Sequence, residues 1–116
     1  MPDTLRISVD PRSDGIAVVR LTGRLDFTSA PHARDQFATA IADSRQTLVV
    51  DLSQGGFVDS AGRGSLIGAM RAARLAGGDL RIANPSEQAT MLLSLTSLDQ
   101  VLTICPTIEE ALRDVS

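Results

Sequence analysis

Hydrophobic and polar residues alternate at the start of the chain. Leu5, Ile7 and Val9 fall on one face of an extended segment, and a second apolar run follows a segment rich in turn-forming residues. Alternation with a period of two is typical of a half-buried strand, and two such strands joined by a short turn favour an antiparallel hairpin. We therefore predict paired strands at residues 4–9 and 16–21.

Three further apolar runs continue the chain, and a helical pattern follows each of them. Strands are predicted at residues 48–52, 80–83 and 101–104. Residues 22–26 are predicted to leave the sheet after the hairpin. Residues 54–56, Gln-Gly-Gly, are predicted to turn the chain after the third strand, because glycine favours turns.

Four helices are indicated by their start and stop signals. A first helix is predicted to begin at residues 28–31, with proline in its first turn, and a second begins at or next to Ser60 and ends at residues 77–78, Gly-Gly. Capping-box spacing at residues 84–87, with proline at the first helical position, and at residues 107–110 predicts the starts of two more. The apolar faces of the four helices are expected to contain Ala33, Phe37, Ala40 and Ile41; Leu66, Ile67, Met70 and Ala73; Met91, Leu92 and Leu95; and Ala111, Leu112 and Val115.

The order of these elements, ββαβαβαβα, defines the fold class. Strands that alternate with helices form parallel βαβ units with right-handed crossovers, and the opening hairpin makes the sheet mixed. We therefore predict an α/β fold in which a mixed central sheet of about five strands packs with about four helices. A chain of 116 residues is long enough for a single core, and residues 1–116 are expected to form one domain.

Composition argues against several classes of function. The net charge is −3 and the only aromatic residues are three phenylalanines, so we expect no nucleic-acid partner. The absence of lysine excludes Schiff-base chemistry and a P-loop. The single cysteine, Cys105, is expected to be a buried reduced thiol. With no targeting segment and no apolar run of membrane-spanning length, the protein is expected to be cytoplasmic, without direct membrane insertion.

The polar residues form no familiar catalytic or metal-binding arrangement. His32, the single histidine, is expected at the surface of a first helical turn, and Ser60 lacks the G-x-S-x-G context of a hydrolase nucleophile. No Cys/His cluster has metal-ligand spacing. Asp51 and Asp59 can approach each other, but acid–base catalysis needs a raised pKa that spacing does not indicate. We predict that the protein is not an enzyme and uses no cofactor or metal.

Residues 48–64, LVVDLSQGGFVDSAGRG, place one hydroxyl at the start of a helix. Ser60 falls at or next to the first turn, where backbone N–H groups lack intrahelical partners and the helix dipole favours negative charge. A serine in this position either caps the helix or accepts a phosphate. The residues alone leave both interpretations open.

The run VVDLSQGGFVDSAGRGSL, with LTGRLDFTSAP before it and RLAGGDLRIANPS and LTSLDQVLTI after it, resembles the STAS-domain family of bacterial anti-sigma factor antagonists. The resemblance spans nearly the whole chain and implies a small mixed sheet packed with helices. It further implies that the serine of D-S-x-G is phosphorylated by a partner that is both anti-sigma factor and serine kinase. The unphosphorylated antagonist binds that kinase and frees the sigma factor, and the phosphorylated form releases the kinase. A phosphatase that resets the serine is a further expected partner.

The resemblance assigns roles to individual residues. Ser60 matches the phosphorylated serine and Asp59 the acidic residue before it. Asp26, with Thr28 close behind, matches a polar loop that lies beside the serine in the family. Gly62 matches a glycine that permits close backbone approach. The partner-binding residues implied in this way are Asp26, Thr28, Asp59, Ser60, Gly62 and Arg63.

Arg63 departs from the family pattern D-S-x-G-L-G, which has leucine at this position. Because it follows Ser60 by three residues on a helix, we expect it within reach of a phosphate on that serine. In the unmodified protein it is expected to pair with Asp59 or to present its charge to the partner. The alternative is a solvated surface arginine.

Two other functions stay open at the level of the sequence. The same fold serves as a docking subunit of larger assemblies, such as an ABC lipid-transport complex, and a D-S-A-G tetrad fits that resemblance too. An enzyme with Ser60 as nucleophile is the third alternative.

Overall fold

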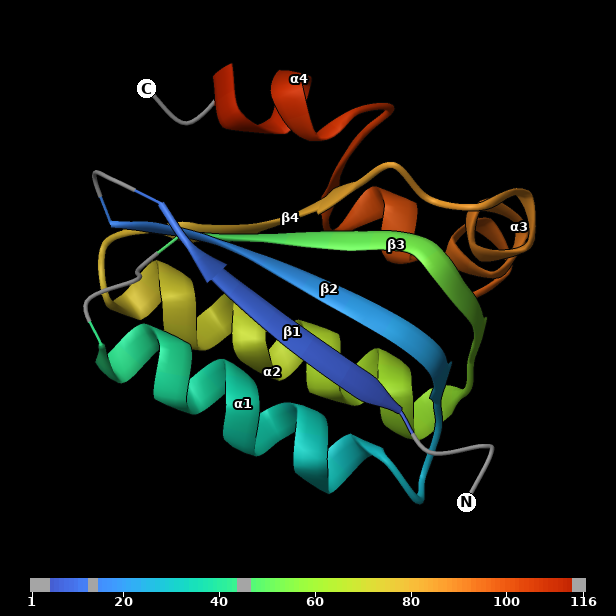
Figure 1. Cartoon of the computed structure of the whole chain (residues 1–116). Coiled ribbons are helices and arrows are strands. Elements are labelled where there is room, and N and C mark those ends of the chain that lie inside the picture. Colours follow the sequence, from blue (N-terminus) through green and yellow to red (C-terminus); the bar gives the residue numbers. More distant parts are fainter. Residues whose placement is uncertain (1–4, 13–14, 44–46, 114–116) are drawn as a thin grey trace.

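The computed structural model describes residues 5–12, 15–43 and 47–113. In these residues a five-stranded mixed sheet forms the centre of the molecule (Figure 1). The strands lie in the sheet in the order in which they occur in the chain. β1 pairs antiparallel with β2, and all other pairs are parallel. The elements are β1 (Arg6–Pro11), β2 (Ile16–Leu25), α1 (Ala30–Ala42), β3 (Thr47–Val58), α2 (Ser60–Leu75), β4 (Asp79–Ala83), α3 (Glu87–Leu95), the 3₁₀ helix η1 (Leu98–Gln100), β5 (Thr103–Cys105) and α4 (Ile108–Arg113).

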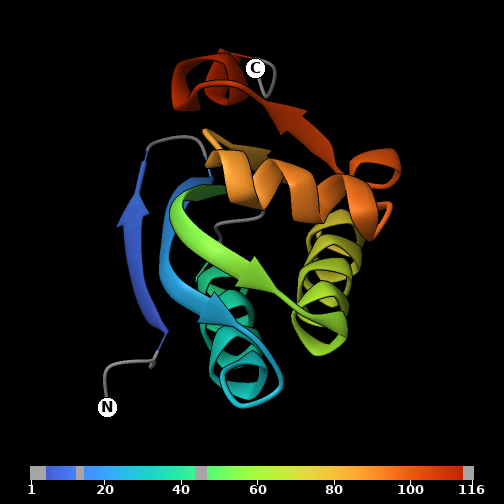
Figure 2. The same cartoon turned by 90° about the vertical axis from the view of Figure 1, so that its right-hand side faces the viewer.

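Helices cover both faces of the sheet (Figures 1 and 2). α1 and α2 lie side by side on one face and α4 lies on the other, whereas α3 packs near the end of β3. This arrangement confirms the predicted α/β class, the opening hairpin and the alternating order of strands and helices. No helix of the described segments is long and apolar enough to cross a membrane.

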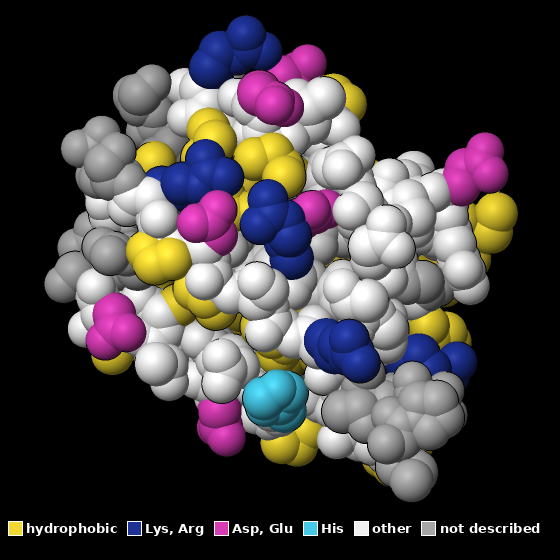
Figure 3. Space-filling view, in the orientation of Figure 1, with side chains coloured by type: hydrophobic (Ala, Val, Ile, Leu, Met, Phe, Trp, Pro, Cys, Tyr) yellow, Lys and Arg dark blue, Asp and Glu magenta, His cyan; other side chains and the backbone are white. Residues whose placement is uncertain are grey.

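Charged side chains are interspersed on the face shown in Figure 3. Asp10 forms ion pairs with Arg12 at 3.1 Å and with Arg20 at 3.8 Å. Arg20 Nε also lies 3.5 Å from the buried carboxylate of Asp51. Both of these arginines are paired with carboxylates, and the charged side chains visible in Figure 3 are of mixed sign, whereas a phosphate backbone is attracted by a continuous basic surface.

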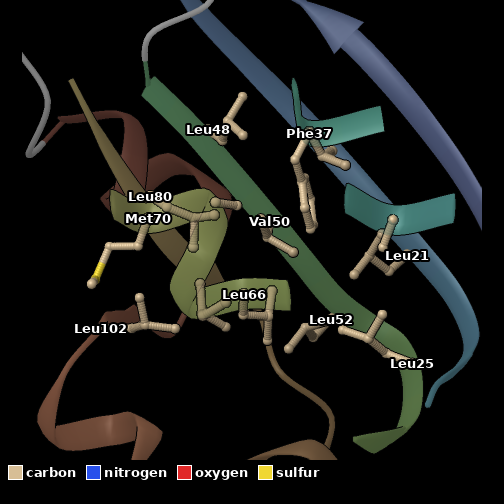
Figure 4. Close-up of a cluster of buried hydrophobic side chains, with 14 of the residues drawn as sticks. Leu21, Leu25, Phe37, Leu48, Val50, Leu52, Leu66, Met70, Leu80 and Leu102 are labelled. Atoms are coloured by element: carbon tan, nitrogen blue, oxygen red, sulfur yellow. The ribbon is translucent and has the colours of Figure 1, made fainter. Parts of the chain in front are cut away.

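The main hydrophobic core lies between the sheet and helices α1 and α2 (Figure 4). Phe37 of α1 and Leu66 of α2 point towards Val50 of the central strand β3, and all three are almost completely buried. A smaller cluster beneath α4 contains Val18 and Cys105. Cys105 was predicted to be a buried thiol, and its burial is confirmed.

Two strands are longer than the sequence pattern predicted. β2 ends at Leu25, so residues 22–25 stay in the sheet, and β3 continues through the predicted turn at residues 54–56 to Val58. Gln54 and Gly55 pair with Thr22 and Gly23 of β2, with register shifts on either side. Local irregularity of this kind accommodates glycine without ending the strand.

The C-terminal part of the chain contains two further corrections. The predicted strand at residues 101–104 is reduced to β5, because Val101 caps the 3₁₀ helix that precedes it. α3 begins at Glu87 with Ser86 as its N-cap, and Asn84 lies outside the helix with a φ of 52°. The predicted capping box at residues 84–87 is therefore wrong by two residues.

The buried face of α3 also differs from the prediction. Met91 and Leu95 are exposed by 64% and 73%, whereas Ala89 and Leu93 are buried. The first and second helices follow the prediction more closely, since Phe37 and Met70 belong to the core. Thr4 and Val115, which were predicted in a strand and on a helical face, lie outside the described residues.

Candidate functional site

The carboxyl ends of β2 and β3 lie side by side, and a helix follows each of them, after a loop at residues 26–29 for β2 and after Asp59 for β3 (Figure 1). Leu25, the last residue of β2, pairs with Val58, the last residue of β3. The loop after β2 and the start of α2 therefore occupy the same edge of the sheet. In open α/β sheets, binding sites are commonly found beyond the carboxyl ends of parallel strands.

Asp59 connects these two segments through its carboxylate. Oδ1 accepts a hydrogen bond from the backbone N–H of Gly62 at 2.9 Å and so caps the N-terminus of α2. Oδ2 accepts a hydrogen bond from the backbone N–H of Phe27 at 3.0 Å. One side chain therefore fixes both the start of the helix and the loop after β2.

Ser60 is the first residue of α2, as predicted, and its side chain is exposed. Its hydroxyl makes no hydrogen bond to any residue within the described segments. Because Asp59 is the N-cap, the structure removes the interpretation that Ser60 caps the helix. The hydroxyl is left accessible at a helix N-terminus, where added negative charge is well tolerated.

Asp26 organises the loop beside Ser60. Its Oδ1 accepts hydrogen bonds from the hydroxyl of Thr28 at 2.6 Å and from the backbone N–H groups of Thr28 and Ser29 at 3.0 and 3.2 Å. The Thr28 hydroxyl bond is the largest cause that lowers the pKa of Asp26 from 3.8 to about 2, with smaller contributions from the two backbone bonds and from Arg24. Asp26 is therefore ionised at neutral pH, and Thr28 is one of its partners.

Gly62 lies against the backbone of β2. A Cβ atom at this position would overlap the carbonyl oxygen of Leu25, and its distance to Leu25 Cγ would be 2.9 Å. The close approach expected for this glycine is confirmed, and it explains how the first turn of α2 fits against the end of β2. A direct contact of Gly62 with a partner stays a prediction.

Arg63 makes a contact that the sequence did not predict. It is half-buried, and its Nε donates a hydrogen bond at 2.8 Å to the carbonyl oxygen of Thr96, the C-cap of α3. Among the described residues it forms no ion pair with Asp59, and it is not a fully solvated surface residue. Its predicted contacts with a phosphate on Ser60 and with a partner remain untested.

Other residues considered for catalysis lie elsewhere or have separate partners. His32 is exposed in the first turn of α1, as predicted. The carboxylate of Asp51 pairs with Arg20, whereas that of Asp59 caps α2. Within the described residues, no group of three or more histidine, cysteine, aspartate or glutamate side chains is placed to hold a metal ion.

Sequence reasoning missed two residues near the site. The carbonyl oxygen of Thr96 accepts the hydrogen bond from Arg63, which lies 33 residues earlier in the chain. No local sequence pattern indicates a contact over this separation. Phe27 lies in the loop after β2 with 72% of its surface exposed. An aromatic residue between the polar residues Asp26 and Thr28 was the signal available for it.

Comparisons with known proteins agree with this geometry. The family model described as the STAS domain matches residues 9–111. The anti-sigma-B factor antagonist of Bacillus subtilis is 28% identical over 101 residues, covering 86% of this chain and 92% of that protein. The unphosphorylated form of the anti-sigma factor antagonist SpoIIAA has a TM-score of 0.80 and 26% identity, covering 95% of this chain and 96% of SpoIIAA.

The phosphorylated form of SpoIIAA, a Bacillus cell fate determinant, is also similar. Its TM-score is 0.72 with 25% identity, and the match covers 96% of this chain and all of that structure. The family match extends from β1 into α4 and includes both loops at the carboxyl edge of the sheet. The chain therefore belongs to the STAS-domain family.

Proposed function

We propose that this protein is an anti-sigma factor antagonist that is switched by phosphorylation of Ser60. Unphosphorylated, it binds an anti-sigma factor with serine kinase activity and so frees a sigma factor for transcription. Phosphorylation by that partner ends the complex, and a phosphatase resets Ser60. The protein acts as a binding protein without a cofactor, in the cytoplasm, where the sigma factor acts.

The observation that carries this proposal is the state of Ser60. Its hydroxyl is exposed and makes no hydrogen bond to the described part of the chain, while the neighbouring Asp59 caps the helix. A kinase therefore finds an accessible hydroxyl whose modification disrupts no internal contact. The names of the relatives support the same function, and so does the existence of SpoIIAA in phosphorylated and unphosphorylated forms.

Electrostatics account for the release of the partner. A phosphate adds roughly −1.5 to −2 charges at neutral pH to a surface that already holds the carboxylates of Asp26 and Asp59. In the free protein the two carboxylates accept internal hydrogen bonds, and the N-terminus of α2 favours the added negative charge. A bound partner would bury them, and an unpaired buried charge costs roughly 2–5 kcal/mol, or about thirty-fold to several-thousand-fold in affinity.

Phosphorylation by the cognate kinase is the direct test. The protein is incubated with the candidate kinase and ATP, its intact mass is measured, and the modified residue is mapped. We expect one phosphate on Ser60 and none on Ser60→Ala. Ser94→Ala, which removes another exposed helical serine, is the control and should be phosphorylated normally. Stoichiometric phosphorylation of Ser60→Ala would refute the assignment.

Binding of the kinase tests the switch separately. Ser60→Ala should bind the anti-sigma factor with the affinity of the unmodified protein, whereas Ser60→Asp should bind it more weakly because it adds a charge beside Asp59. Equal affinities of the two variants in titration calorimetry would exclude electrostatic release.

A further inference from the structure

The three phenylalanines of the chain have different environments. Phe37 is 1% exposed in the main core. Phe57 is half-buried, and the guanidinium of Arg24 lies 4.2 Å from the centre of its ring. Phe27 is 72% exposed. It is the aromatic side chain that a binding partner reaches most easily.

The backbone that carries Phe27 is held in place on both sides. Its own N–H donates to Oδ2 of Asp59, the residue that precedes Ser60. The carboxylate of Asp26 accepts hydrogen bonds from Thr28 and Ser29, and the hydroxyl of Ser29 donates to the carbonyl oxygen of Arg24 at 2.7 Å. The loop is thus tied to α2 and to β2, while the ring itself projects from it.

A fixed loop with an exposed aromatic ring is well suited to binding. Aromatic residues are enriched at protein interfaces, and a small number of anchors inserted into partner pockets supply most of the binding energy. Binding also loses less conformational entropy when the segment that carries the anchor is already ordered. The hydrogen bonds of Asp26 and Asp59 provide that order without covering the ring.

We propose that Phe27 is the apolar anchor of the surface around Ser60 and that it inserts into an apolar pocket of the protein partner. The inference rests on the proposed function, because the partner is the anti-sigma factor that binds next to the serine. The rim of that pocket carries hydrogen-bond donors or cations near Asp59, whose carboxylate accepts the Phe27 N–H, whereas the carboxylate of Asp26 is already paired with Arg24.

The same connection explains how the anchor responds to phosphorylation. Asp59 joins the Phe27 loop to the first turn of α2, so a phosphate on Ser60 lies beside the rim of the pocket that receives the ring. Inserting the ring would then bury the phosphate as well, and burial of an unpaired charge is strongly unfavourable. The anchored complex and the phosphate exclude each other, although the fold is unchanged.

Other exposed apolar side chains lack this connection to Ser60. Leu75 is 91% exposed, but it lies at the far end of α2, fifteen residues and about 22 Å along the helix axis from Ser60. Met91 and Leu95 are exposed on α3, which the hydrogen bonds of Asp59 do not reach. Leu95 adjoins Thr96, the acceptor of the Arg63 hydrogen bond, so it is not a suitable control. Leu75 is therefore the matched control for an exposed hydrophobic residue outside the proposed surface.

The test compares the affinities of four proteins for the purified anti-sigma factor by titration calorimetry. Phe27→Ala should lower the affinity by on the order of 30-fold or more. Phe27→Leu, which keeps an apolar side chain of similar length, should recover much of that loss. Leu75→Ala should bind like the wild-type protein. The thermal midpoints of all variants should stay close to that of the wild type, because neither side chain belongs to the core.

The outcomes separate this inference from the function on which it rests. If the wild-type protein binds the kinase and Phe27→Ala binds it within about twofold, the anchor is refuted and the proposed function stands. An equal loss of affinity in Leu75→Ala would also refute it. If the wild-type protein neither binds nor is phosphorylated by an anti-sigma kinase, the function and the anchor are both overturned.

Discussion

The side chain of Arg63 joins the first turn of α2 to the end of α3, because its Nε donates to the carbonyl oxygen of Thr96 at 2.8 Å. The last carbonyl groups of a helix have no intrahelical donors, and a cation near a helix C-terminus is favoured by the dipole. The arginine that replaces the family's usual leucine therefore serves a structural contact between two helices.

Replacing this arginine by leucine should destabilise the protein. Arg63→Leu removes the hydrogen bond to Thr96, and we expect the free energy of unfolding to fall by about 1 kcal/mol. Urea denaturation followed by circular dichroism measures the change. The control is Arg71→Leu, an exposed arginine on the same helix, which should change stability little. Equal stability of wild type and Arg63→Leu would mean that the contact contributes nothing in solution.

Two glycines of α2 should respond to alanine in opposite directions. Gly62→Ala places a Cβ against the backbone of Leu25, and such overpacking costs about 1–3 kcal/mol. At Gly68 an added Cβ would meet no atom within 4 Å, so Gly68→Ala should stabilise the helix by about 0.5–1 kcal/mol. Thermal unfolding of both variants gives the comparison. A stable Gly62→Ala would show that the helix start shifts easily away from β2.

The carboxylate of Asp59 should matter for stability as well as for the site. Asp59→Ala removes the helix cap and the acceptor of the Phe27 N–H, and we expect a loss of about 1–2 kcal/mol. Asp35→Ala, an exposed carboxylate in α1, is the control and should be nearly neutral. In amide exchange, the Phe27 N–H should lose protection in Asp59→Ala. Unchanged protection there would contradict the hydrogen bond between the two loops.

Asp26 should make stability depend on acid pH. Its pKa lies near 2 in the folded protein, below its ordinary value of 3.8. The unfolded chain therefore binds the proton first, and the stabilisation by this group is complete above about pH 4 and lost as the pH falls from 3.8 to about 2. The stability difference between wild type and Asp26→Asn, measured in urea, should narrow over this range. A pKa of Asp26 near 3.8 in the folded protein, measured by NMR titration of its carboxyl group, would contradict this prediction.

The core positions of α1 and α2 and the place of Ser60 were predictable because they depend on local signals. Periodic apolar residues identified the strands and α2, and the D-S-x-G element followed a buried strand. The predicted turn at residues 54–56 was wrong for a reason outside that segment. Its neighbours on β2 supply the hydrogen bonds that keep Gln54 and Gly55 in the sheet, and a local pattern contains no information about them.

Long-range contacts limited the prediction of the site itself. The sequence placed Asp59 next to Ser60, but its second hydrogen bond goes to Phe27, 32 residues earlier. The exposure of Met91 and Leu95 likewise follows from how α3 sits near the end of β3. Helical spacing identified an apolar stripe on α3, whereas the position of the helix on the sheet decided which residues are buried.

The Ser60 hydroxyl makes no hydrogen bond to the rest of the described structure, so phosphorylation of Ser60 need not change how fast the protein is degraded. Proteases act on the transiently unfolded chain, so the lifetime of a protein in the cell follows its folded fraction. A phosphate on Ser60 would break no internal hydrogen bond and would lie at a helix N-terminus, where it is favoured. Modified and unmodified molecules would then have similar half-lives. The supply of binding-competent protein would be set by the ratio of kinase to phosphatase activity, with no need for new synthesis or degradation.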